Sequence, residues 1–328
     1  MFRLFKDARY DFLGARRYAY VATIAVALPG FALLGFRGLN ESIEFTGGTL
    51  VQIQARNPAI AEGGIRDALN QAGLQGAEVQ RFGAPDEFVI RARLSPDVQQ
   101  TVESTQETAA AVDTALTRAF GAGGYEMVRT EAVGPKVGGE LRRKALLAIL
   151  LSFGATLVYL WFRFEWRFGI AAIGATAHDI LLTISFVSMM NLEVSLVVIA
   201  AILTIVGYSL NDTIVVFDRI RENLRKYKRH YMAELVNLSV NETLPRTIMT
   251  GSTTLVGTIA LIAVGSEVIR GFAWVMTFGI VVGTFSSIFI ASPILLAIER
   301  RWPGEDARGA RAMAPPRGPG TPPGPAGS

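Results

Sequence analysis

Long apolar segments separated by polar stretches dominate the pattern along this chain. A helix that spans a bilayer needs about 20 mostly apolar residues. Six segments approach or exceed this length, and we expect each to be a transmembrane helix: 18–35, 145–162, 168–190, 194–217, 247–264 and 272–298. The first could instead be a cleaved signal peptide. It is long for one and is interrupted by Pro29, so we expect an uncleaved anchor.

The polar stretch between the first two apolar segments, residues 36–140, predicts a separate α+β domain. Alternating apolar and polar residues predict four strands: 41–54 with a break at Gly47-Gly48, 78–82, 87–93 and 126–133. Apolar residues at helical spacing predict a helix around 65–72. Ser95-Pro96 predicts the start of a second helix that runs to about residue 120. The order βαββαβ is that of a ferredoxin-like domain.

Basic residues beside the apolar segments predict the orientation, because cytoplasmic loops are enriched in Lys and Arg. They flank the first segment, the turn before residue 168, the stretch 218–245 and the end of the last segment. Residues 1–17 and the Pro- and Gly-rich tail 303–328 are therefore predicted to be cytoplasmic, the tail being disordered. The domain 36–140 becomes periplasmic, although the basic cluster at 142–144 then lies on the outer side. In the cytoplasmic stretch, 218–226 is predicted to be an amphipathic helix on the membrane surface.

Composition and charge support this organisation and exclude several kinds of site. Half of the residues are hydrophobic and 18% are charged, below the ~25% of soluble domains. Residues 37–138 carry a net charge of −4 and the rest of the chain +8. With no cysteine and only two histidines, we expect no metal site. No nucleotide-binding or hydrolase motif occurs, so we predict no enzymatic activity and no cofactor. Acids interleaved with the bases of 218–226 argue against nucleic-acid binding.

Five polar residues lie in or beside the predicted membrane spans and are the candidate proton-coupling residues: His178, Asp179, Asn211, Asp212 and Arg246. Charged residues at such depth are costly and usually face a pair or a pathway. We hypothesise that Asp212 and Arg246 form a proton-linked ion pair on the cytoplasmic side. Arg246 could instead be a membrane-surface anchor, and Asp212 a static cap or partner. His178 and Asp179 could be a hydrogen-bonded packing pair. Gly279 and Gly283 form a GxxxG pair, which most often marks close helix packing.

Several motifs resemble the SecF members of the SecD/SecF family of bacterial protein-export membrane proteins, which belongs to the RND superfamily. The matching segments cover the chain in order from residue 1 to about 302: 45–49, 133–138, 207–223 and 246–250. The resemblance implies a six-helix half of an RND-type bundle in the bacterial inner membrane, with a SecD partner. It also implies action beside the SecY, SecE and SecG channel and YajC, contact with preprotein and lipids, and an indirect link to SecA. The proton-sensitive acid and arginine of the family map onto Asp212 and Arg246, and its His-Asp pair onto His178 and Asp179.

Three functions remain open at this stage. The resemblance favours an accessory subunit that uses the proton-motive force to assist late steps of preprotein translocation. The alternatives are a half-size RND-type exporter of lipids or small solutes, and a passive scaffold for the channel. The small external domain favours the first over the exporter.

Overall fold

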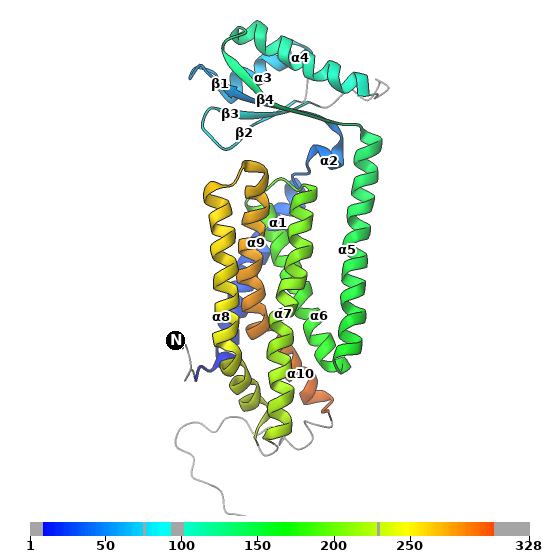
Figure 1. Cartoon of the computed structure of the whole chain (residues 1–328), viewed down its shortest axis with the longest axis vertical. Coiled ribbons are helices and arrows are strands. Elements are labelled where there is room, and N and C mark those ends of the chain that lie inside the picture. Colours follow the sequence, from blue (N-terminus) through cyan, green and yellow to red (C-terminus); the bar gives the residue numbers. More distant parts are fainter. Residues whose placement is uncertain (1–8, 75–76, 93–101, 228–229, 305–328) are drawn as a thin grey trace, which may run out of the picture.

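The computed structural model of the chain describes residues 9–74, 77–92, 102–227 and 230–304. A small α/β domain stands at one end of a bundle of long helices (Figure 1). Six helices are long and apolar enough to cross a membrane, as predicted. They are α1 (Phe12–Arg37), α5 (Pro135–Arg163), α6 (Trp166–Met189), α7 (Leu196–Lys226), α8 (Met232–Val264), and a last crossing formed by α9 (Glu267–Ser286), a π-helical turn (Ser287–Ala291) and α10 (Ser292–Arg301).

The α/β domain contains one antiparallel sheet and two helices on one of its faces (Figure 1). Its elements are β1 (Gly48–Ala55), α3 (Glu62–Gln71), β2 (Glu78–Arg81), β3 (Glu87–Ala92), α4 (Val102–Phe120) and β4 (Tyr125–Val133). The strand order is β2-β3-β1-β4. The βαββαβ element order therefore agrees with the prediction, whereas the predicted helix start at Ser95-Pro96 lies outside the described residues.

Alternation along the strands explains why the helices cover one face of the sheet. Side chains of successive residues point to opposite faces. Val51 and Ile53 of β1 pack with Ile65 of α3 and Leu116 of α4 in one buried cluster. Leu50 lies on the other face, toward the bundle, with Val89 and Ile43.

The segment before Gly47 corrects one prediction. Residues 41–54 were expected to be one interrupted strand, but Ile43–Thr46 forms a short helix, α2, and the strand begins only at Gly48. Gly47 has φ 73° and Gly48 φ 125°, values that favour glycine, so the chain reverses here rather than continuing as a bulged strand. The short helix buries Ile43 beneath the sheet, a contact that alternation along the sequence does not reveal.

The stretch after the fourth predicted span corrects another prediction. Residues 218–226 were expected to lie on the membrane surface, but they are the last turns of the uninterrupted helix α7. Ile220 and Leu224 are buried in the bundle cluster together with Leu235 and Val236 of α8. The apolar face that suggested a surface helix therefore packs against α8.

Two apolar clusters fill the bundle, one in the half away from the α/β domain and one in the half near it. The first contains Phe168 and Phe217, and the second contains Ile205 and Met276. Polar residues lie between them along the same helices: Asp179, Thr183, Ser209, Asp212, Thr284 and Ser286. Two of the candidate residues, Asp179 and Asp212, thus belong to a polar layer inside the bundle.

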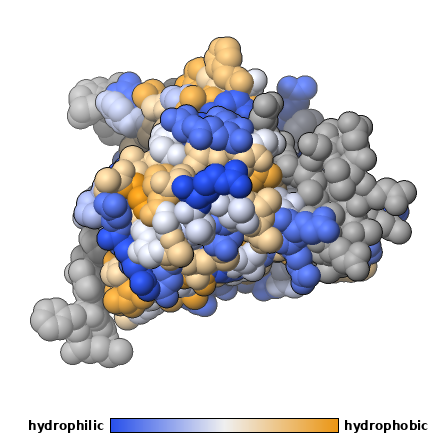
Figure 2. Space-filling view, turned by 90° about the horizontal axis from the view of Figure 1, so that it is seen from above, coloured by the Kyte–Doolittle hydropathy of each residue, from blue (hydrophilic) through white to orange (hydrophobic). Residues whose placement is uncertain are grey.

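The face of the α/β domain that points away from the bundle is mixed in character. Figure 2 shows hydrophilic residues across its middle, with apolar residues between them. A solvated surface of this kind suits a domain outside the bilayer.

Candidate functional site

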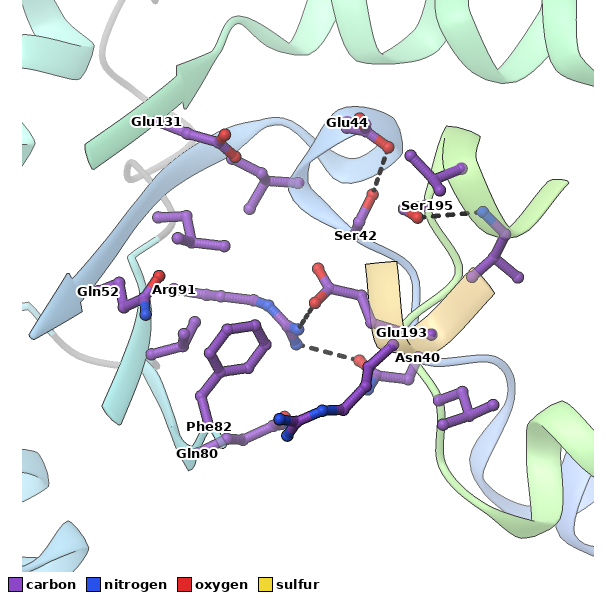
Figure 3. A pocket seen from close by; sticks show the side chains of 18 of the residues that line it. Asn40, Ser42, Glu44, Gln52, Gln80, Phe82, Arg91, Glu131, Glu193 and Ser195 are labelled. Atoms are coloured by element: carbon purple, nitrogen blue, oxygen red, sulfur yellow. Dashed lines mark hydrogen bonds and ion pairs between the residues drawn. The ribbon is translucent and has the colours of Figure 1, made fainter. Parts of the chain in front are cut away.

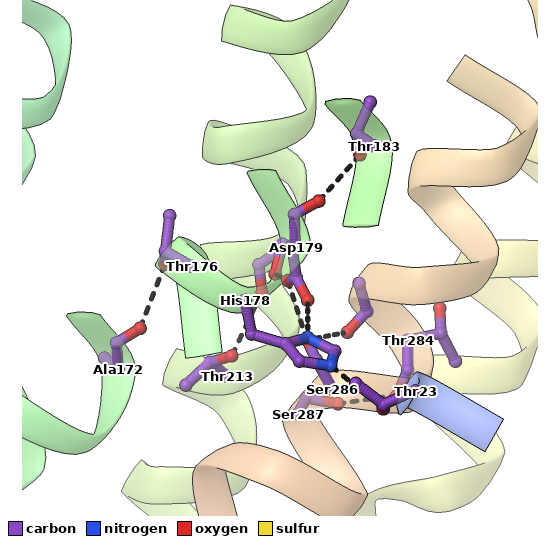
Figure 4. Close-up of polar contacts among 12 residues, drawn as sticks. Thr23, Ala172, Thr176, His178, Asp179, Thr183, Thr213, Thr284, Ser286 and Ser287 are labelled. Atoms are coloured by element: carbon purple, nitrogen blue, oxygen red, sulfur yellow. Dashed lines mark hydrogen bonds and ion pairs between the residues drawn. The ribbon is translucent and has the colours of Figure 1, made fainter. Parts of the chain in front are cut away.

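Asp179 of α6 is the centre of a hydrogen-bonded network that joins four helices (Figure 4). Its side chain is 1% exposed. The Oδ1 atom lies 2.9 Å from His178 Nδ1, and Oδ2 accepts hydrogen bonds from Ser209 of α7 at 2.5 Å and Ser286 of α9 at 2.7 Å. His178 Nε2 lies 3.1 Å from the hydroxyl of Thr23 on α1.

Every polar atom of the His178 and Asp179 side chains therefore has a partner. A neutral imidazole satisfies both of its contacts, because Nδ1–H donates to the carboxylate and Nε2 accepts from the Thr23 hydroxyl. Interhelical hydrogen bonds of this kind contribute about 0.6 kcal/mol each on average within membranes. The arrangement holds α1, α6, α7 and α9 together.

Asp212 of α7 has a different environment. The residue is 3% exposed, and its Oδ2 atom has no hydrogen-bond partner among the described residues. The same holds for the buried hydroxyls of Tyr208, Thr247 and Thr284. A methyl group on Gly251 of α8 would lie 3.3 Å from Thr284 Oγ1 and 3.9 Å from Tyr208 Oη, so α7, α8 and α9 meet closely here. Because buried polar groups normally have partners, this junction provides groups that can bind water or a proton.

Arg246 of α8 is the predicted ion-pair partner of Asp212. Within the described part of the chain, the two side chains make no ion pair within 4.0 Å. Arg246 and Asn211 are both exposed on the bundle surface, and neither side chain has a hydrogen-bond partner among the described residues. The predicted ion pair is therefore not formed in this structure, and its linkage to protons stays a prediction.

The structure separates the predicted residues into two neighbouring environments, the Asp179 network and the junction around Asp212. His178 and Asp179 contact each other, as the packing alternative expects, whereas Asn211 is exposed and its neighbour Asp212 is buried. Sequence reasoning did not single out Thr23, Ser286, Tyr208 and Thr284. Their signal is weak, since each is a single polar residue within an apolar helix. Tyr208 alone could have been found by spacing, because it lies one helical turn before Asp212.

Two family descriptions match the chain. Residues 111–301 match "Protein export membrane protein SecD/SecF, C-terminal", and residues 32–59 match "SecD/SecF GG Motif". Among curated proteins, the protein translocase subunit SecF of Gemmatimonas aurantiaca is 51% identical over 95% of this chain and 94% of that protein. The SecF subunit of Desulfurispirillum indicum is 42% identical over 87% of this chain and 90% of that protein.

Two solved structures are similar to the fold. The crystal structure of SecDF, a translocon-associated membrane protein from Thermus thermophilus, has a TM-score of 0.78 and 39% identity over 90% of this chain. A structure of SecDF in a super-membrane-facing form has a TM-score of 0.64 and 39% identity over 92% of this chain. The chain spans only 39% and 40% of those SecDF chains, respectively.

Proposed function

Because this chain belongs to the SecD/SecF family of protein-export membrane proteins, we propose that it is the SecF-type accessory subunit of a Sec translocase. Together with a SecD-type partner it uses the proton-motive force to assist late steps of preprotein translocation. The observation that carries this proposal is the buried Asp212 carboxyl, which has a cation nearby but none in contact. The chain acts as a transport subunit rather than as an enzyme.

Proton exchange at Asp212 can move a helix because it changes the charge beside Arg246. An ionised carboxylate attracts the guanidinium strongly in a low-dielectric environment, whereas the protonated form does not. Only 17% of the apolar stretch of α8 is buried, against 44% for α7. The weakly enclosed α8 can therefore shift relative to α7, which carries Asp212. A membrane potential supplies about 2.3 kcal/mol per charge per 100 mV.

The bundle surface supports a second membrane subunit. Asn211 and Arg246 are exposed at positions that a bilayer would cover. Polar groups facing lipid are costly, so a partner helix covers this surface. We assign that partner to SecD in a separate chain, forming a heterodimer. The heterodimer works beside the SecY, SecE and SecG channel and YajC, acts on the translocating preprotein, and is linked to SecA only indirectly.

We place the chain in the bacterial inner membrane with both termini in the cytoplasm and the α/β domain in the periplasm. The basic cluster at 142–144, which opposes this orientation, is partly neutralised. Arg142 pairs with Glu41 at 3.3 Å, and Lys144 pairs with Glu140 at 2.8 Å. Two of its three charges therefore have acidic partners, which weakens the cluster as a signal for the cytoplasmic side.

His178 and Asp179 serve mainly as a fixed frame in this proposal. Their hydrogen-bonding capacity is saturated by neighbouring helices. A hydrogen-bonded network of this kind resists rearrangement, so these helices, α7 included, move together as one body relative to α8. The alternative function, a half-size RND-type exporter of lipids or small solutes, is less favoured because the named relatives are translocase subunits.

Asp212→Asn tests the proposal, because an amide has a similar shape but cannot exchange a proton. The assay measures preprotein translocation into vesicles that hold the full chain, the SecD-type partner and the Sec channel, with and without a proton gradient. We expect the variant to assemble normally but to lose the stimulation that depends on the gradient.

Asp218→Asn is the matched control, since Asp218 lies on the same helix and pairs with Arg163 at an exposed site. We expect it to retain gradient-dependent stimulation. Wild-type stimulation in the Asp212→Asn variant would contradict the proposal.

A further inference from the structure

The turn between α6 and α7, residues 190–195, is joined to the chain that leads into the α/β domain. Ser42 N donates to Val194 O at 3.0 Å, and Val194 N donates to Asn40 O at 2.8 Å. The Asn40 side chain also donates to Asn191 O at 3.2 Å. These bonds form a short parallel bridge between two segments about 150 residues apart in sequence.

Three side-chain contacts strengthen this connection, and Figure 3 shows the two that Arg91 makes. Glu44 of α2 accepts a hydrogen bond from Leu196 N at 2.6 Å, which caps the first turn of α7. Arg91 of β3 is 7% exposed and pairs with Glu193 of the turn at 2.7 Å. The Arg91 guanidinium also donates to Asn40 Oδ1 at 3.0 Å. A sheltered ion pair with an additional hydrogen bond has a defined geometry, so the sheet and the turn are held in register.

Two cavities also lie between the α/β domain and the side of the bundle that holds the α8–α9 turn. A cavity of about 300 Å³ lies between the sheet, the α6–α7 turn and the start of α9; Glu44, Arg91 and Glu193 line it together with Arg129 and Trp274. A second cavity of about 540 Å³ separates the sheet from the α8–α9 turn, with Gly83 and Ser266 in its lining. The domain is thus joined to the bundle at the α6–α7 turn and, through Gly134, at the start of α5, while the cavities leave space toward α8 and α9.

The helix capped by Glu44 also carries the proposed proton site. Asp212 follows Leu196 by 16 residues in the uninterrupted helix α7, a distance of about 24 Å. A continuous helix transmits a displacement along its length with little internal change. We propose that Glu44, Arg91 and Glu193 are positioning residues that transmit movement of α7 to the α/β domain. The inference rests on the proposed function, since the movement originates in proton exchange at Asp212.

We call the contacts of Glu44, Arg91 and Glu193 the clamp. A purely structural clamp would hold the α/β domain in place without transmitting movement from α7. The two roles differ in what they predict for a weakened clamp. A structural clamp keeps α7 in place, so weakening it would impair the proton site as well. A transmitting clamp acts only after proton exchange at Asp212 has occurred. Weakening it therefore leaves proton flux unchanged.

The experiment measures proton flux, domain position and translocation in the full chain assembled with its SecD-type partner. The chain has no cysteine, so Asn70→Cys on α3 and Val264→Cys at the end of α8 place two spin labels at exposed positions. Double electron–electron resonance measures the distance between the two labels, once in the chain with Asp212 and once in the Asp212→Asn variant. We expect the distance to differ between these two forms in the otherwise unchanged chain.

Glu44→Gln and Arg91→Ala are the clamp variants, and Arg91→Lys is the conservative one. We expect the clamp variants to abolish the distance change and to reduce gradient-dependent translocation about tenfold, within the usual range of coupling between sites. Proton flux, measured with a pH-sensitive dye, stays at the wild-type level, and Arg91→Lys recovers part of the distance change. The control removes an exposed ion pair of the same domain, Arg56–Glu126, whose side chains are 62% and 57% exposed.

Two results would overturn the inference. One is an unchanged distance response in assembled Glu44→Gln and Arg91→Ala variants. The other is a loss of proton flux together with translocation in assembled Glu44→Gln, since a structural clamp predicts that result. Asp212→Asn without the clamp variants tests the proposed function separately, because normal translocation there would contradict the proton site and not the clamp.

Discussion

Gly283 of α9 lies against α7 at the point where the two helices carry the polar layer. A methyl group at this position would lie 2.9 Å from Ser209 Cβ and 3.2 Å from Ser209 Cα. Real Cβ atoms do not approach carbon atoms this closely, so Gly283→Ala forces α9 and α7 apart. Ser209 donates the 2.5 Å hydrogen bond to Asp179, so the separation also strains the polar network.

The magnitude follows from three effects. Inserting a methyl into a well-packed contact costs about 1–3 kcal/mol. Losing the interhelical hydrogen bond of Ser209 costs about 0.6 kcal/mol. Replacing glycine by alanine within a helix returns up to about 1 kcal/mol through helix propensity. We therefore expect Gly283→Ala to lower the free energy of unfolding by about 1–2 kcal/mol.

Reversible unfolding in mixed detergent micelles, followed by circular dichroism, measures this change. Gly257→Ala on α8 is the matched control, because nothing lies within 4 Å of the added methyl and residue 257 is exposed. The control should be neutral or slightly stabilising. Equal stability of the two variants would refute the proposed close contact between α7 and α9.

Two further predictions concern the ends of the molecule. Tyr125 Oη hydrogen-bonds Asp113 Oδ1 at 2.6 Å and the Thr117 hydroxyl at 2.9 Å, so Tyr125→Phe should destabilise the α/β domain by about 1–2 kcal/mol in chemical denaturation. Burial and the Asp113 carboxylate raise the pKa of Tyr125 to about 12. The wild-type domain should therefore lose stability between pH 10 and 12, because only the unfolded phenol ionises there, and a similar loss in Tyr125→Phe would contradict this origin. At the other end, Glu299 is 2% exposed and pairs with Arg167 at 2.8 Å, so Glu299→Gln should cost about 3 kcal/mol. Glu165→Gln, which removes a more exposed partner of the same arginine, should cost less than about 1 kcal/mol, and equal melting temperatures would contradict the difference.

Much of the fold follows from local properties of the sequence. The six apolar segments are long enough to cross a bilayer wherever the rest of the chain lies. Strand alternation and helical spacing likewise indicate the elements of the α/β domain, including α3 and β4 within a few residues. GxxxG spacing at Gly279 and Gly283 indicated close packing, and the approach of Gly283 to Ser209 confirms it.

The errors occurred where distant segments meet. Residues 43–46 alternate like a strand but form a helix, since Glu44 there caps α7 and Ile43 is buried beneath the sheet. Residues 218–226 have the pattern of a surface helix, but α8 returns alongside and covers their apolar face. A pattern shows that one face needs covering and does not show what covers it.

The candidate site divides in the same way. The sequence by itself determined that His178, Asp179, Asp212 and Arg246 lie in or beside membrane spans, because the cost of a polar group in lipid depends on residue type and depth. Only the tertiary structure decided that Asp179 is hydrogen-bonded from two other helices, by Ser209 and Ser286, while Asp212 keeps an unpartnered oxygen. Hydrogen bonds form over about 3 Å, and which groups come that close depends on how helices far apart in the chain pack together.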